Sequence, residues 1–209
     1  MDDAASISKI LLEIKAVTLN PGKPYTFVSG IRSPIYCDNR LILSYPEKRA
    51  AIINAFSELI KRNKLGCDII AGVATSGIPF AALLAEKLGK PMVYVRPDAK
   101  KHGKGNMIEG RVEQGKKALV VEDLISTGGS SLAVVEALRE AGVRVAECLA
   151  IFTYTFKKAA DNFEEHNCKL YTLADFPNLI KVAAKQGYIK ESELQHVLSW
   201  SRNPEQWQP

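Results

Sequence analysis

ALVVEDLISTGGSS, residues 118–131, places an apolar run, two adjacent acidic residues and a hydroxyl-rich glycine turn in direct succession. The run Ala118–Val121 is apolar without alternation, which is typical of a strand buried on both faces of a parallel sheet. Apolar residues then recur at helical spacing from Leu132 to Ala141, and Gly142 is suited to end a helix. The stretch therefore predicts a strand, a turn and a helix, with functional groups where the strand ends.

The turn Ser126–Ser130 has the composition of a phosphate site. A helix N-terminus offers unpaired N–H groups and a positive dipole end, and adjacent glycines let the backbone approach the anion. The turn lacks the Lys-Ser or Lys-Thr pair of a nucleoside-triphosphate loop, and the chain has no G-x-G-x-x-G dinucleotide motif. A glycine turn alone is equally compatible with an ordinary strand-to-helix connection that has an acidic N-terminal cap.

The acid pair Glu122-Asp123 makes the turn more specific. Two carboxylates beside a phosphate would repel it unless they bind something else. They suit either ribose hydroxyls or a divalent cation that bridges other phosphates of the ligand. The combination therefore favours a sugar phosphate as ligand.

The composition is that of one ordinary globular domain spanning residues 1–209, with 46% hydrophobic and 24% charged residues. We recognise no leader and no apolar run long enough for a bilayer, so we expect a cytoplasmic protein without a membrane partner. The four cysteines are widely spaced and predict neither a zinc site nor a disulfide framework. The net charge of +5 is modest and mostly scattered, which favours small anionic substrates over nucleic acid.

Three further apolar runs predict strands at 68–73, 92–95 and 145–152. The first leads through Ala74-Thr75-Ser76-Gly77 into a helix expected near Pro79, which repeats the plan of strand, hydroxyl-bearing turn and helix. Other helices are expected over residues 7–17, after a Ser44/Glu47 capping box, and in a tail beyond Pro177. The alternation predicts an α/β fold with a mainly parallel central sheet and helices on both faces.

Residues 96–111, RPDAKKHGKGNMIEGR, are polar, glycine-rich and strongly basic. A solvated loop is the simpler interpretation, but it leaves the density of cations unexplained. A lid that closes over a polyanion accounts for both features. Such a lid would neutralise a leaving group and exclude water from the reacting sugar.

These segments together resemble the type I phosphoribosyltransferases, and within them the orotate-specific members. The resemblance rests on VVEDLISTGGSS (120–131), SGIRSPIYCD (29–38), GVATSGIPFA (72–81) and AKKHGKG (99–105). The turn motif is shared by the whole superfamily, whereas its combination with the other segments is specific. The resemblance implies transfer of the phosphoribosyl group from phosphoribosyl pyrophosphate (PRPP) to orotate, giving orotidine 5′-monophosphate and pyrophosphate in pyrimidine synthesis.

The resemblance also implies particular site residues and partners. Residues 1–45 would form a small hood over the sheet, and Mg²⁺ would be the cofactor, held mainly through the substrate. The active unit would be a homodimer in which Arg96, Lys100 and His102 of the lid reach the neighbouring subunit's site. Ser126 would face orotate, while Tyr36 either stacks on the base or is a structural strand residue. The PRPP-binding set would be Thr75, Ser76, Arg96, Lys100, His102, Glu122, Asp123, Leu124, Ile125, Ser126, Thr127, Gly128, Gly129 and Ser130.

Breaking the glycosidic bond creates positive charge on ribose and negative charge on pyrophosphate. Lys100, His102 and Asp123 would therefore be the catalytic residues, the first two acting on the leaving group and the third on the ribose. His102 would supply either a proton or, as we favour, a hydrogen bond. Two alternatives share the acid pair and the turn: a purine-base phosphoribosyltransferase, and a PRPP-sensing regulator that binds nucleic acid.

Overall fold

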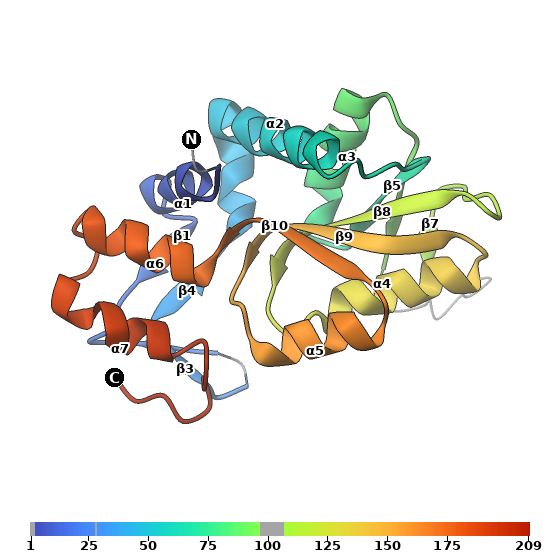
Figure 1. Ribbon diagram of the computed structural model, residues 1–209. Coiled ribbons are helices and arrows are strands. Elements are labelled where there is room, and N and C mark those ends of the chain that lie inside the picture. The colour runs from blue at the N-terminus through green and yellow to red at the C-terminus, as the bar shows by residue number, and fades with distance from the viewer. Residues whose placement is uncertain (1–2, 28, 97–106) are drawn as a thin grey trace.

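A six-stranded sheet forms the centre of the protein in a computed structural model, which describes residues 3–27, 29–96 and 107–209 (Figure 1). Five strands are parallel, and the short β7 (Ile108–Glu109) pairs antiparallel with β6 at one edge. From edge to edge, the parallel strands are β10 (Lys169–Asp175), β9 (Arg144–Thr153), β8 (Lys117–Ile125), β5 (Ile69–Val73) and β6 (Met92–Val95). The expected mainly parallel sheet is confirmed.

Helices cover both faces of this sheet (Figure 1). Leu119 and Val121 of β8 face a cluster that includes α1 (Asp3–Glu13), α2 (Pro46–Arg62) and α3 (Gly77–Leu88). Ala118 and Val120 face the opposite cluster, which includes α4 (Gly129–Glu140) and α5 (Lys157–Glu165). The unalternated apolar run thus serves two cores, as the sequence predicts. In the described ranges no helix has the length and apolar character needed to span a bilayer.

Two local predictions are wrong, and one strand was not predicted. Ser44 does not begin a capping box: it ends a 3-10 helix, η1 (Asn39–Ser44), and α2 follows Tyr45, which has no side-chain cap bond. The first helix ends at Glu13 rather than 17, because Val17 starts a strand that pairs with a distant segment. The strand β10 was not predicted, since its half-buried edge position leaves a mixed polar and apolar sequence.

Both terminal parts of the described chain lie together beside the sheet (Figure 1). We call this region, residues 3–27, 29–45 and 176–209, the hood. Two antiparallel ribbons come from the N-terminal part: β1 (Val17–Leu19) with β4 (Ile35–Cys37), and β2 (Tyr25–Thr26) with β3 (Arg32–Ser33). Helices α6 (Phe176–Lys185) and α7 (Leu194–Ser199) lie beside them. Trp200 joins the two parts, because its indole N–H donates to the carbonyl of Arg32 at 2.9 Å.

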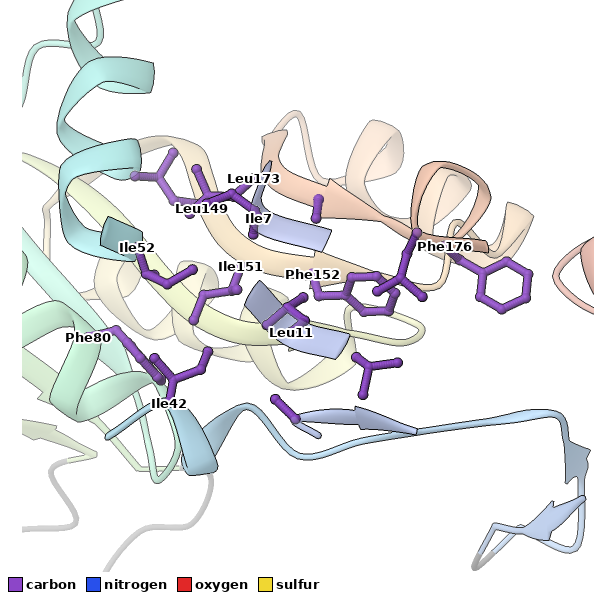
Figure 2. Close-up of a cluster of buried hydrophobic side chains, with 14 of the residues drawn as sticks. Ile7, Leu11, Ile42, Ile52, Phe80, Leu149, Ile151, Phe152, Leu173 and Phe176 are labelled. Carbon is purple, nitrogen blue, oxygen red and sulfur yellow. The ribbon is translucent and has the colours of Figure 1, made fainter. Parts of the chain in front are cut away.

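The hood shares its core with the sheet. Figure 2 shows Ile7 and Leu11 of α1 directed toward side chains of β9 and β10, with Ile42 of η1 nearby. These side chains are buried, and they belong to the same cluster as Leu149, Ile151 and Phe152 of β9. Continuous packing of this kind sets the position of the hood relative to the strand ends.

We predict that Trp200→Ala lowers the free energy of unfolding by about 3–5 kcal/mol, because it empties a fully buried position and removes the bond to Arg32. Urea unfolding measures the loss. Tyr188→Ala, at a side chain that is 48% exposed, is the control and should change stability by no more than about 0.5 kcal/mol. Equal stabilities of the two variants would contradict this account of the hood.

Candidate functional site

The candidate site lies where the order of strands reverses direction. β5 and β8 are neighbours, yet the chain proceeds from β5 to β6 on one side and from β8 to β9 on the other. Connections that diverge in this way leave a crevice at the carboxyl ends of the two strands. The turn after β5 carries Thr75 and Ser76, and β8 ends with the acid pair and Ser126. The fold therefore brings together the two hydroxyl-bearing turns that the sequence singles out.

The acid pair forms a compact hydrogen-bonded unit within β8. Glu122 is buried: its Oε1 accepts from the Asp123 backbone N–H at 2.9 Å, and the Ser131 hydroxyl donates to its Oε2 at 3.5 Å. Burial, reinforced by the charge of Asp123, raises the pKa of Glu122 to about 9. Burial also raises the pKa of Asp123, while its hydrogen bond with Glu122 opposes that rise. At neutral pH, Glu122 therefore keeps its proton.

The glycine turn leads directly into α4. Gly128 is the residue before the helix, with a left-handed φ of 82°, and its carbonyl accepts from the Leu132 N–H at 2.9 Å. The Asn162 side chain of α5 donates to the Thr127 carbonyl at 2.9 Å and holds the turn from outside. Gly129 and Ser130 are exposed at the helix N-terminus, where backbone N–H groups have no partner within the helix. This geometry is suited to an anion.

The turn after β5 packs closely against β8, which we call the acid strand because it carries Glu122 and Asp123. Its Ala74-Thr75 peptide bond is cis, and Thr75 is exposed. A Cβ atom added to Gly77 would lie 2.5 Å from the Val121 carbonyl oxygen and 3.4 Å from Oε1 of Glu122. Only a residue without a side chain fits this contact, so Gly77 allows the two turns to approach each other.

A pocket of about 280 Å³ separates the two turns. Its lining includes two residues of the hood, Asp38 and Arg40, to which the sequence alone assigned no role. The intervening Asn39 is buried, and its amide donates to the Asp123 carbonyl at 2.7 Å. A hydrogen bond between residues 84 positions apart leaves no signal in the sequence. The pocket is lined by Cys37, Asp38, Arg40, Ala74, Thr75, Ser76, Glu122, Asp123, Leu124 and Ser130.

A second pocket, of about 450 Å³, lies on the other side of Ser126 and Thr127. Its hood wall includes Phe27, Ser29 and Ile31 from the SGIRSP region and the C-terminal residues 201–205. Phe156 and Lys157, which follow β9, complete it. The turn Ser126–Ser130 thus contributes to both pockets: Ser126 and Thr127 line the larger one, and Ser130 lines the smaller, carboxylate-rich one. The contribution of the C-terminal segment was not foreseen, because it depends on how the chain returns to the hood.

The remaining candidates occupy different places. Tyr36 is 46% exposed, and its ring lies 5.6 Å from that of Tyr25, so its assignment to a base stays a prediction. Ile125 is buried and its carbonyl accepts from the Tyr154 N–H. Arg96 forms an ion pair with Glu109 of its own chain at 3.1 Å. Lys100 and His102 lie outside the described residues.

The oxygen donors of the smaller pocket fit the chemistry of Mg²⁺. This ion prefers oxygen ligands and commonly binds through one or two carboxylates together with substrate phosphates. Glu122 and Asp123 supply two carboxyl groups, and the hydroxyls of Thr75, Ser76 and Ser130 surround them. Within the described ranges, histidine, cysteine and acidic side chains form no cluster of three or more that could hold a metal ion.

Comparisons with known proteins agree with this geometry. Residues 42–183 match the model of the phosphoribosyl transferase domain family. The chain is 56% identical to the orotate phosphoribosyltransferase of Coxiella burnetii, covering all of both chains. It is 53% identical to that of Staphylococcus haemolyticus, covering 96% of this chain and 99% of the relative. The crystal structure of orotate phosphoribosyltransferase from Aeropyrum pernix aligns with a TM-score of 0.76 at 29% identity, covering 88% of this chain and 99% of that one.

We predict that Gly128→Ala destabilises the protein by about 1–3 kcal/mol, because its φ of 82° is strained for alanine and the new Cβ would lie 2.7 Å from the Phe163 ring. Gly129→Ala is the matched control, since its Cβ meets nothing within 4 Å and its φ is ordinary. Denaturant unfolding of both variants measures the difference. The prediction is wrong if the two substitutions have the same effect.

We predict that Glu122→Gln changes how stability depends on pH. A folded-state pKa of about 9 against an ordinary value of 4.5 means that the folded protein binds the extra proton between these values. Wild-type stability should therefore fall as pH rises from 4.5 toward 9, and the neutral glutamine should avoid this loss. Between pH 5 and pH 8, the stability of Glu122→Gln relative to wild type should rise by about 1–3 kcal/mol.

Urea titrations at several pH values would measure this gain. Glu58→Gln, at a carboxylate that is 66% exposed, serves as the control and should leave the pH dependence unchanged. Parallel pH profiles for wild type and Glu122→Gln would show that Glu122 ionises normally in the folded protein.

Proposed function

Because the chain belongs to the orotate phosphoribosyltransferases of the phosphoribosyl transferase domain family, we propose that the two pockets lined by the turn Ser126–Ser130 receive the two substrates of that reaction. The enzyme transfers the phosphoribosyl group of PRPP to orotate in pyrimidine biosynthesis, a glycosyl transfer that releases pyrophosphate. The observation that carries the assignment of pockets is that the turn Ser126–Ser130 lines both of them, the larger through Ser126 and Thr127 and the smaller through Ser130.

PRPP would occupy the smaller pocket. The turn Ser126–Ser130 would bind its 5-phosphate, because this turn presents free backbone N–H groups at the N-terminus of α4. The carboxyl group of Asp123 would accept hydrogen bonds from the ribose hydroxyls, and neutral Glu122 would donate one. Thr75 and Ser76 would contact the diphosphate from the opposite wall.

Orotate would occupy the larger pocket. The ring needs apolar walls, which Phe27, Ile31 and Phe156 supply, and its carboxylate needs a cation or hydroxyl donors. Lys157 and Ser29 offer both kinds of group, and Ser126 would face the ring from the turn. Tyr36 would take part only if its ring left Tyr25.

Mg²⁺ would be held mainly by the substrate's diphosphate, beside the carboxyl group of Asp123, and would neutralise charge on the leaving group. The chain's own residues would act on the sugar. Asp123 would stabilise the positive charge that develops on ribose as its bond to pyrophosphate breaks, because it lies in a partly desolvated pocket. The ring nitrogen of orotate attacks, so the mechanism requires no protein nucleophile.

The lid would supply cations to the departing pyrophosphate. Arg96 pairs with Glu109, and its backbone N–H donates to the Met107 carbonyl at 3.0 Å, so Arg96 and Met107 lie together at the edge of the sheet. Lys100 and His102 would act from this segment on the neighbouring subunit. For Arg96 to do the same, its pair with Glu109 would have to open.

A homodimer would cover exposed apolar side chains of the segment 36–45, which also contributes Cys37, Asp38 and Arg40 to the smaller pocket. Tyr36, Leu41 and Tyr45 are each at least 40% exposed and lie within ten residues of one another. Clusters of exposed apolar side chains commonly mark protein interfaces. A cytoplasmic location is consistent with Cys37, Cys67, Cys148 and Cys168, which are all free thiols and suit a reducing compartment.

The lid acting in trans can be tested by mixing subunits. Lys100→Ala should lower kcat by about a hundred- to a thousandfold, the usual loss on removing one preorganised donor, and Asp123→Asn should inactivate the other half of the site. Mixed after subunit exchange, the two variants should regain activity, because a hybrid dimer has one site with both groups intact. The loss of orotate absorbance in the presence of PRPP and Mg²⁺ measures turnover.

Subunit exchange is verified with differently tagged chains, and each variant alone serves as the control. Absence of recovery despite exchange would contradict action in trans. Turnover of adenine or hypoxanthine in place of orotate by the wild type would support the purine-base alternative. Absence of turnover with every base would leave the PRPP-sensing regulator.

A further inference from the structure

Arg40 is the one basic residue among the described residues that line the smaller pocket. The same lining carries three acidic residues, Asp38, Glu122 and Asp123. A diphosphate that entered this pocket would meet a carboxylate-rich wall, and it would need a cation from the protein as well as any metal ion it carried. Arg40 is positioned to supply that charge from the same chain.

Asp38 holds the Arg40 side chain in place. The Arg40 Nε lies 2.6 Å from Oδ1 of Asp38 and its Nη2 lies 2.8 Å from Oδ2, while the Arg40 backbone N–H donates to Oδ1 at 3.2 Å. This arrangement leaves Nη1 without a hydrogen-bond partner in the part of the chain that the structure describes. The Arg40 side chain remains 63% exposed, so it is oriented but accessible to a ligand.

The backbone that carries Arg40 is fixed to the acid strand. Asn39 is 1% exposed, and its amide donates to the carbonyl of Asp123 at 2.7 Å. The Cys37 thiol donates to Oδ1 of Asn39 at 3.4 Å, so the residues on either side of Asp38 belong to one network. Hydrogen bonds of a buried amide side chain are costly to break. The backbone on the N-terminal side of Arg40 is therefore held against β8.

We propose that Arg40 binds the diphosphate group of PRPP, and the pyrophosphate product, within the same subunit. This inference rests on the proposed function, because it assumes that PRPP occupies the smaller pocket. The diphosphate is favoured over the 5-phosphate because Thr75 and Ser76 line the same pocket, whereas Ser130 is the one residue of the turn Ser126–Ser130 in its wall. A guanidinium group suits this task, since it presents several N–H donors in one plane to phosphate oxygens.

Arg40 and the lid then have different tasks. Arg40 is part of the hood and is present before the lid closes, so it contributes to capture of the diphosphate and to retention of pyrophosphate. The lid cations would act on the charge that develops during bond breaking. Loss of Arg40 should therefore weaken PRPP and pyrophosphate binding more than it slows turnover at saturation.

Calorimetric titration of the intact protein with pyrophosphate in the presence of Mg²⁺ tests the proposal directly. Arg40→Gln should weaken pyrophosphate binding by about tenfold or more, as expected for loss of a charge-assisted hydrogen bond. Its affinity for ribose 5-phosphate should change by less than about twofold, because a distant exposed charge contributes little. Lys61→Ala is the matched control, since Lys61 is 67% exposed and pairs with a carboxylate outside the pocket.

Steady-state kinetics provide a second measurement. Arg40→Gln should raise the KM for PRPP by about tenfold and leave the KM for orotate within about twofold of wild type. Arg40→Lys keeps the charge and should lose less than Arg40→Gln. It also preserves the test if the glutamine variant fails to fold. Thermal unfolding of each variant checks that the hood is intact.

Unchanged pyrophosphate affinity in Arg40→Gln would overturn the proposal, and so would an equal loss of ribose 5-phosphate affinity. Equal losses in the lysine and glutamine variants would assign the effect to the pair with Asp38 rather than to charge. These outcomes are independent of turnover. A wild-type protein that bound pyrophosphate but did not use orotate would contradict the proposed function and still allow Arg40 to be judged.

Discussion

The burial of β8 on both faces is the constraint on which the rest of the structure depends. Leu119 and Val121 pack into one core and Ala118 and Val120 into the other, so the strand has no freedom to shift or turn. The residues that follow are therefore delivered to the edge of the sheet in a fixed orientation. A buried strand is a rigid support for a polar site because any displacement would disturb two cores at once.

This rigidity accounts for the unusual electrostatics of the acid pair. A carboxyl group is stable at 5% exposure if it is neutral or well paired, and Glu122 is held by a backbone N–H, a hydroxyl and its neighbour's carboxylate. The pair thus places a neutral carboxyl group, which can donate a hydrogen bond, beside a second carboxyl group that can accept one.

The hood completes the site from the other side. Asn39 joins it to the acid strand through a buried bond, and Trp200 joins its N-terminal ribbons to the C-terminal tail. The cluster around Ile7, Leu11 and Ile151 makes the hood and the sheet one packed body. Each of the two pockets consequently has one wall from the sheet and one from the hood. The distance between the two pockets is then set by packing rather than by a flexible hinge.

Much of the fold could be predicted because its signals are local. The apolar runs at 69–73, 92–95, 118–121 and 145–152 are strands, and the two hydroxyl-bearing turns lie at their carboxyl ends. Burial on both faces removes alternation, and a helix after a glycine turn has its own periodicity. By contrast, β10 lies at a half-buried edge and Tyr45 replaces the expected cap, so local patterns were misleading there.

The sequence by itself determined the strand-turn-helix units and the chemical groups that each turn carries, because these follow from composition and spacing within a few residues. Only the tertiary structure decided that Asn39 contacts Asp123, that Arg40 lines the smaller pocket and that residues 201–205 line the larger one. These contacts join segments separated by tens to more than a hundred residues. They depend on the path of the whole chain, which neighbouring residues do not encode.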